Sequence, residues 1–121
     1  MRTFASLLLA AFVCLAFVAP AWAHAHLVTA DPAVGGTVAA TDTLRLTFSE
    51  GIEIAFSKVA VAEEGGAEVG PAKIALDPAD KKIVIVTLPA PLRPGLYTVN
   101  WQVVSVDTHR TRGDFSFTVK P

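Results

Sequence analysis

The residues best suited to metal chemistry in this sequence are its three histidines and one aspartate. His24 and His26 follow a predicted cleavage point, and His109 lies two residues after Asp107. A chain that begins at His24 offers its α-amine and its ring Nδ1, which together close a chelate ring on one metal ion. The α-amine has an ordinary pKa of about 7.7–8.0, so a metal ion can displace its proton near neutral pH.

Asp107 and His109 are the residues that would complete such a site. In an extended segment, side chains two residues apart point to the same side, so this pair adds a carboxylate oxygen and an imidazole. Three nitrogens and one oxygen form a tetragonal set that suits Cu(II). After residue 23 the sequence contains no cysteine and no methionine, the soft ligands that favour Cu(I). Zn(II) remains chemically possible, because it also accepts His and Asp.

The same residues allow other interpretations. His24 could be a free terminus, and Asp107 and His109 could be turn residues whose aspartate caps nearby amides. The start His24-Ala25-His26 could also wrap Cu(II) with the amine, two deprotonated backbone amides and the His26 ring. That mode requires a flexible terminus, and a strand that begins at Ala25 would block it by committing the amides to a ladder.

The first 23 residues have the features of a secretory signal peptide. Arg2 precedes an apolar run from Leu7 to Val18, and Ala21-Trp22-Ala23 supplies a small-x-small cleavage site. The apolar run is short for a membrane span, so no membrane insertion is expected after cleavage. Cleavage would remove the only cysteine and leave residues 24–121. We therefore expect a periplasmic protein without disulfides.

Alternation of apolar and polar residues predicts that residues 24–121 form one all-β domain. The expected strands are residues 26–29, 44–48, 58–61, 83–86, 97–103 and 115–120. Residues 83–86 are apolar throughout, which predicts a central strand covered on both faces, and residues 26–29 are expected at an edge. Frequent prolines leave room for at most one helical turn, near residues 77–81. The pattern is typical of an antiparallel immunoglobulin-like β-sandwich.

The charge balance excludes one class of partner. After residue 23, nine Lys and Arg residues face eleven Asp and Glu residues, so there is no basic excess to attract nucleic acid. No basic stretch is interleaved with aromatic residues either. Nucleic acid is therefore not expected as a partner.

Five motifs occur in order along residues 24–121. They are His24-Ala25-His26-Leu27, Asp31-Pro32-Ala33, Phe48-Ser49-Glu50, Leu92-x-Pro94-Gly95-x-Tyr97-x-Val99-x-Trp101, and Ser105-x-Asp107-x-His109-x-x-x-Gly113-x-Phe115-x-Phe117. Together they resemble the CopC family of periplasmic copper-resistance proteins. The resemblance implies a Greek-key β-sandwich of cupredoxin-like or immunoglobulin-like type that binds copper.

The resemblance also implies how each residue would act. His24 would bind Cu(II) through its amine and Nδ1, and Asp107 and His109 would complete the plane, an arrangement called a histidine brace. Each chain would hold one ion. Glu50 would lie nearby and orient the amine or a bound water, and whether His26 binds the metal stays open. Some family members bind Cu(I) through a methionine-rich loop. The corresponding residues 59–73 contain no methionine, so a single Cu(II) site is expected.

The function implied is a carrier or buffer that sequesters periplasmic copper, with handover to an inner-membrane partner of the CopD type. A carboxylate in the metal plane stabilises the oxidised state, so we do not expect an enzyme. Two alternatives stay open: a copper-dependent oxidase or monooxygenase that uses the same histidine brace, and a metal-free interaction module. Thr108, where many family members have glycine, is a small departure from the pattern.

Overall fold

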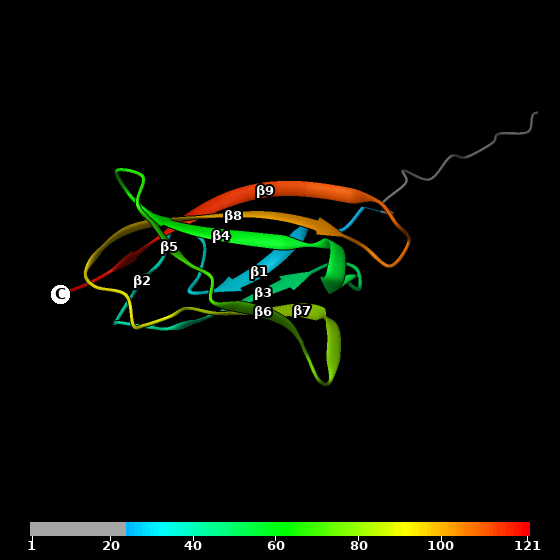
Figure 1. The fold of residues 1–121 in the computed structure, drawn as a ribbon, viewed down its shortest axis with the longest axis horizontal. Coiled ribbons are helices and arrows are strands. Elements are labelled where there is room, and N and C mark those ends of the chain that lie inside the picture. The colour runs from blue at the N-terminus through cyan, green and yellow to red at the C-terminus, as the bar shows by residue number, and fades with distance from the viewer. Residues whose placement is uncertain (1–23) are drawn as a thin grey trace, which may run out of the picture.

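Two β-sheets pack face to face in the computed structural model, which describes residues 24–121 (Figure 1). The predicted signal peptide, residues 1–23, lies outside the described residues. The elements in chain order are β1 (Leu27–Asp31), β2 (Thr37–Val38), β3 (Thr43–Phe48), the 3-10 helix η1 (Ile54–Phe56), β4 (Lys58–Glu63), β5 (Glu68–Gly70), β6 (Lys73–Asp77), β7 (Asp80–Thr87), β8 (Gly95–Val104) and β9 (Arg110–Val119). Within this range, no helix has the length and apolar character needed to cross a membrane.

The strands divide between a four-stranded and a five-stranded sheet. Their orders are β1-β3-β7-β6 and β2-β9-β8-β4-β5. The short β2 pairs with β9 in parallel, and the other strand pairs are antiparallel. The all-β sandwich predicted from the sequence is therefore confirmed.

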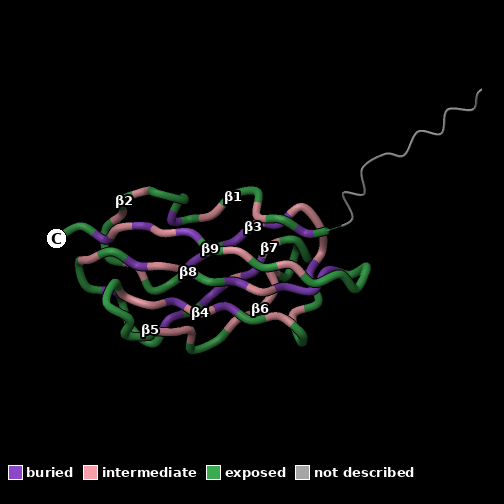
Figure 2. The backbone as a smooth tube through the Cα atoms, turned by 90° about the horizontal axis from the view of Figure 1, so that it is seen from above, coloured by how far each residue is buried: buried purple, intermediate pink, exposed green. Residues whose placement is uncertain are grey.

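The core lies between the sheets and is filled by alternate residues of β3, β4, β7, β8 and β9, and Figure 2 shows the buried positions along these strands. Phe48 of β3 and Trp101 of β8 meet across the two sheets, edge to face, with ring centroids 5.1 Å apart. Gly113 of β9 pairs with Trp101, and a Cβ built at this glycine would lie 2.5 Å from the indole Cζ2. Glycine is required there because the indole occupies the space of a side chain.

The six strands expected from alternation are all present, and residues 26–29 do belong to an edge strand, β1. One expectation about residues 83–86 is wrong. They are central, between β3 and β6, but Ile83 and Ile85 are only partly buried. Each sheet of a sandwich covers its neighbour on one face only, so the second face of even a central strand stays partly open to solvent.

The one helical turn that the prolines leave room for does not lie near residues 77–81, where it was expected. Asp77 pairs with Asp80 across a tight hairpin turn, and the carboxylate of Asp77 accepts a hydrogen bond from the Ala79 amide at 2.8 Å. The short helix is η1, in residues 54–56. Strands β2, β5 and β6 lacked a clear period-two signal and were not predicted.

Three chain segments meet at one end of the sandwich. They are the start of the described chain, the turn between β8 and β9, and residues 49–53 after β3 (Figure 1). Hydrogen bonds join Ser49 to His26 and Gly51 to Val106. This end therefore carries the residues for which metal chemistry is predicted.

Candidate metal centre

The turn between β8 and β9 folds back on itself from Ser105 to His109. The ladder of the hairpin ends at the pair Val104 and Arg110. Beyond it, the amide of Ser105 donates to the carbonyl of His109 at 2.9 Å, and the amide of Thr108 donates to the carbonyl of Ser105 at 2.8 Å. Thr108 has a φ of 73°, and within residues 24–121 it is the single non-glycine residue with a positive φ. This geometry fixes where the side chains on either side of Thr108 can lie.

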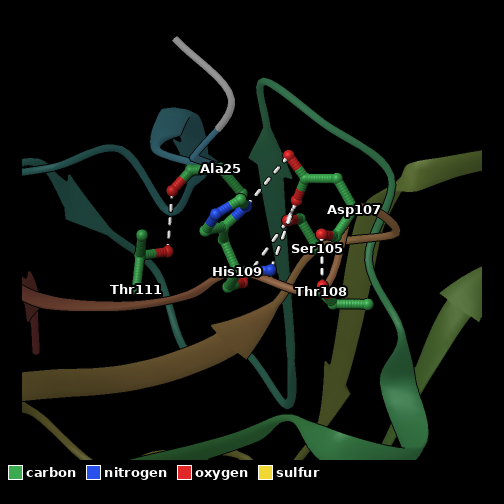
Figure 3. Close-up of polar contacts among 6 residues, drawn as sticks. All are labelled: Ala25, Ser105, Asp107, Thr108, His109 and Thr111. Carbon is green, nitrogen blue, oxygen red and sulfur yellow. Dashed lines mark hydrogen bonds and ion pairs between the residues drawn. The ribbon is translucent and has the colours of Figure 1, made fainter. Parts of the chain in front are cut away.

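Ser105 is the one buried polar residue among residues 24–121. Its hydroxyl donates a hydrogen bond to Oδ1 of Asp107 and lies 3.3 Å from the carbonyl oxygen of His109 (Figure 3). Its backbone forms an isolated bridge to Ile52. The buried hydroxyl of Ser105 thus holds the carboxylate of Asp107 in place.

The carboxylate of Asp107 faces His109 as well as Ser105. Its Oδ2 lies 3.3 Å from Nδ1 of His109, and its Oδ1 lies 3.3 Å from the His109 amide nitrogen. The hydrogen bond from Ser105 is the largest cause that lowers the pKa of Asp107, and those from His109 add to it, while desolvation opposes them. Asp107 is therefore ionised at neutral pH, as a metal ligand must be.

Residues 24–26 form an N-terminal arm that is tied to both sheets. The carbonyl of Ala25 accepts a hydrogen bond from Oγ1 of Thr111, at the start of β9, at 2.7 Å. The amide of His26 donates to Oγ of Ser49 at 3.0 Å, and the amide of Ser49 donates to the carbonyl of His26 at 2.9 Å. Ala25 is buried. These hydrogen bonds fix the arm in place, with His24 next to the turn between β8 and β9.

The structure brings the three predicted ligands together in a chain of contacts. The rings of His24 and His109 meet edge to face, with centroids 4.6 Å apart and planes at 83°. Nδ1 of His109 in turn faces Asp107. Both His109 and Asp107 are partly open to solvent, with side-chain exposures of 51% and 35%. A metal ion can therefore reach this cluster from outside.

Side chains alone do not make a closed metal site here. Within residues 24–121, no group of three or more His, Cys, Asp or Glu residues is arranged to hold a metal ion. The predicted site differs from such a cluster, because one of its donors is the main-chain nitrogen of His24. That nitrogen belongs to a peptide bond in the uncleaved chain and becomes an amine only when the chain begins at His24.

The two residues with weaker predicted roles, Glu50 and His26, lie in segments that are hydrogen-bonded to each other or to the turn. Glu50 stands between Ser49, which binds the arm, and Gly51, whose carbonyl accepts the amide of Val106 at 2.9 Å. It therefore occupies the segment that joins the arm to the turn. The backbone of His26 is committed to Ser49 on both its amide and its carbonyl. Roles for these two side chains at a metal stay predictions.

Sequence reasoning did not assign a role to the residues that hold the site in place. The spacing Ser105-x-Asp107 is a signal that could have been used, because Ser and Asp two residues apart in a turn can hydrogen-bond to each other. Thr111 gave no local signal, since its partner Ala25 is 86 residues away in the sequence.

A family model and sequences of known proteins match most of residues 24–121. The family model described as "CopC domain" matches residues 27–120. Protein YobA of Escherichia coli (strain K12) is 45% identical over 102 residues, which cover 82% of this chain and 81% of that protein. Copper resistance protein C of Xanthomonas campestris pv. juglandis is 38% identical over 107 residues, which cover 84% of each chain.

Two solved structures share the fold and a substantial part of the sequence. The crystal structure of PcoC, a methionine-rich copper resistance protein from Escherichia coli, matches with a TM-score of 0.74 and 33% identity, over 80% of this chain and 99% of that one. The crystal structure of CopC from Methylosinus trichosporium OB3b matches with a TM-score of 0.73 and 31% identity, over 81% and 95%.

Proposed function

The chain belongs to the CopC family, and from this premise we propose that it is a periplasmic Cu(II)-binding protein that sequesters or carries copper. The metal is cargo, one ion per chain. We assign its ligands as the α-amine and Nδ1 of His24, the carboxylate of Asp107 and the imidazole of His109. The observation that carries the proposal is the 4.6 Å contact between the rings of His24 and His109, two residues that lie far apart in the sequence.

The donor set suits Cu(II) on chemical grounds. It combines three nitrogens with one carboxylate oxygen, a set that fits the tetragonal preference of this ion. The lowered pKa of Asp107 keeps its carboxylate ionised, and that negative charge favours the oxidised metal. Nδ1 of His109 lies 3.3 Å from Oδ2 of Asp107, so the imidazole and the carboxylate are close enough to bind the same ion.

The relatives support copper as the cargo. One of the solved relatives is described as a methionine-rich copper resistance protein. By contrast, residues 24–121 of this chain contain neither methionine nor cysteine. We therefore propose that this member holds Cu(II) at one site and has no thioether site for Cu(I).

The docked arm favours the brace over the alternative in which the first three residues wrap the metal. Wrapping requires that the amide of His26 lose its proton and bind Cu(II). That amide donates instead to Oγ of Ser49 at 3.0 Å. The wrap would also require Ala25 to leave its buried position.

Three further parts of the proposal rest on family membership and the leader sequence. Residues 1–23 direct export to the periplasm and are removed. Glu50 orients the amine of His24 or a bound water. The copper is passed to an inner-membrane partner of the CopD type.

The test compares a chain that begins at His24 with a chain that carries one extra alanine in front of it. Cu(II) is titrated into each against a competing chelator, with the fluorescence of Trp101, the only tryptophan after residue 23, as the signal. We expect one equivalent to bind tightly to the first chain and at least about 100-fold more weakly to the second, because the amine is lost as a ligand. Equal binding by both would exclude the amine, and no binding by either would refute the copper function.

Reduction of the bound metal tests whether the protein is a carrier rather than an oxidase. The carboxylate ligand should make the Cu(II) complex slow to reduce with ascorbate. Sustained oxygen consumption by the copper-loaded protein with ascorbate would support the oxidase alternative instead.

A further inference from the structure

We infer that Thr111 is a positioning residue for the copper site: its hydroxyl holds the N-terminal arm so that His24 lies against His109 before the metal arrives. This inference rests on the proposed Cu(II) site. Thr111 itself does not bind the metal in this scheme. It acts through the backbone of Ala25, the residue next to His24.

The contact that carries the inference joins two residues that are 86 positions apart in the sequence. Oγ1 of Thr111 donates to the carbonyl oxygen of Ala25 at 2.7 Å (Figure 3). Thr111 lies two residues after His109. Residues 109–111 therefore supply both a proposed ligand and the hydrogen bond, here called the clamp, that holds Ala25 next to His24. Moving the clamp would therefore move His24 relative to His109.

The hydrogen bond between Thr111 and Ala25 is partly shielded from water. Ala25 is 1% exposed, so its carbonyl has little access to water if Thr111 is removed. On the other side of the arm, Ser49 binds the amide and carbonyl of His26. Ser49 follows β3 of the four-stranded sheet, and Thr111 belongs to β9 of the five-stranded sheet. The arm is thus held from both layers, with His24 just beyond the clamp.

The expected effect follows from preorganisation. A terminal residue that is free to move must be ordered when it binds, and this cost reduces affinity. Loss of one hydrogen bond of ordinary strength changes an equilibrium by about threefold to tenfold. We therefore expect Thr111→Val, which keeps the β-branched shape and removes the hydroxyl, to weaken Cu(II) binding by about that factor.

A double-mutant cycle separates positioning from a general effect on the fold. Four proteins are compared by competitive Cu(II) titration: the chain that begins at His24 and the chain with one extra alanine, each with Thr111 or with Thr111→Val. We expect Thr111→Val to weaken binding by the first chain and to have no further effect on the second, which cannot use the amine. Thr111→Ser should restore the wild-type affinity, because it restores the hydroxyl.

Matched controls keep the result interpretable. Thr98 of β8 has a hydroxyl 3.4 Å from Oγ of Ser116 of β9, away from the arm. Thr98→Val removes this hydroxyl and should leave Cu(II) affinity unchanged. Thermal unfolding of each metal-free variant shows that it is folded, and Thr111→Ala replaces Thr111→Val if the latter does not fold.

Three outcomes would overturn the inference or its premise, and they are distinct. If the extra alanine weakens binding but Thr111→Val does not, the copper site stands and the positioning role is wrong. If Thr111→Val weakens both chains equally, Thr111 acts through the fold and not through the arm. If the extra alanine has no effect on the wild-type chain, the proposed amine ligand itself is wrong.

Discussion

Two hairpin turns of this sandwich use an aspartate in the same local way but give it different partners. In the turn between β6 and β7, Oδ1 of Asp77 accepts the amide of Ala79 two residues later at 2.8 Å. Its Oδ2 pairs with Nη2 of Arg45 on β3 at 2.9 Å. The carboxylate is thus satisfied by a backbone amide and a permanent cation, and it fastens the turn to the sheet.

In the turn between β8 and β9, Asp107 also lies near the amide two residues later, that of His109, at 3.3 Å. Its other oxygen faces the His109 imidazole, and the hydroxyl of buried Ser105 supports it from within. No guanidinium or ammonium group of residues 24–121 forms an ion pair with it.

The difference shows what separates a structural aspartate from one that can bind a metal. Both carboxylates have a lowered pKa, with hydrogen bonds as the largest cause in each. Asp77 has its charge neutralised by arginine. Asp107 keeps its charge beside an imidazole, which is itself a metal ligand. The identity of the partner therefore tells the two apart, whereas the pKa does not.

The largest expected effect distinguishes the two turns directly. His109→Ala removes a proposed ligand and should weaken Cu(II) binding by at least about 100-fold, more than the loss of a supporting group. Asp77→Asn, the matched change in the other turn, should leave the affinity unchanged. Competitive titration with Trp101 fluorescence measures both, and equal losses in the two variants would contradict the assignment.

The second effect concerns the support of Asp107. Ser105→Ala should lower Cu(II) affinity by about tenfold, because the carboxylate loses the hydroxyl that fixes its position. The free energy of unfolding of the metal-free protein should fall by about 1 kcal/mol for the lost hydrogen bonds. Titration and urea unfolding test the two parts separately. An unchanged affinity together with a lower stability would assign Ser105 to the fold alone.

The comparison also explains how far the sequence could predict this molecule. Alternation in residues 44–48 and 97–103 requires only a half-buried strand, so the fold class followed from local pattern. Asp107 and His109 were identifiable because their donors lie two residues apart. The hydrogen bonds from Thr111 to Ala25 and between Ser49 and His26 join segments that meet only after the two sheets pack. No short window of sequence contains that information.

The third effect concerns the backbone of the turns. Thr108 has a φ of 73°, a region that costs non-glycine residues about 1 kcal/mol or more. Thr108→Gly should therefore raise the free energy of unfolding by about 0.5–1 kcal/mol. Ala79→Gly, in the other turn, has no positive φ to relieve and should lower it. Urea unfolding of both metal-free variants tests this, and the same sign of change in both would contradict the account.

The smallest effect is the pH dependence of the other turn. The hydrogen bond from the Ala79 amide is the largest cause that holds the pKa of Asp77 below its ordinary value of 3.8, followed by the bond from Arg45. A carboxylate with a lowered folded-state pKa stabilises the protein above its unfolded-state pKa and loses that contribution as the pH falls through the folded-state pKa. Asp77→Asn keeps an acceptor for Ala79 and removes the charge. The stability difference between wild type and this variant should therefore be constant near neutral pH and shrink below about pH 4.

The pair with Arg45 is partly exposed, so added salt should shrink the stability difference further. Urea unfolding from pH 7 to pH 3 measures it, and a difference that does not change with pH would mean that Asp77 acts through its shape and not its charge.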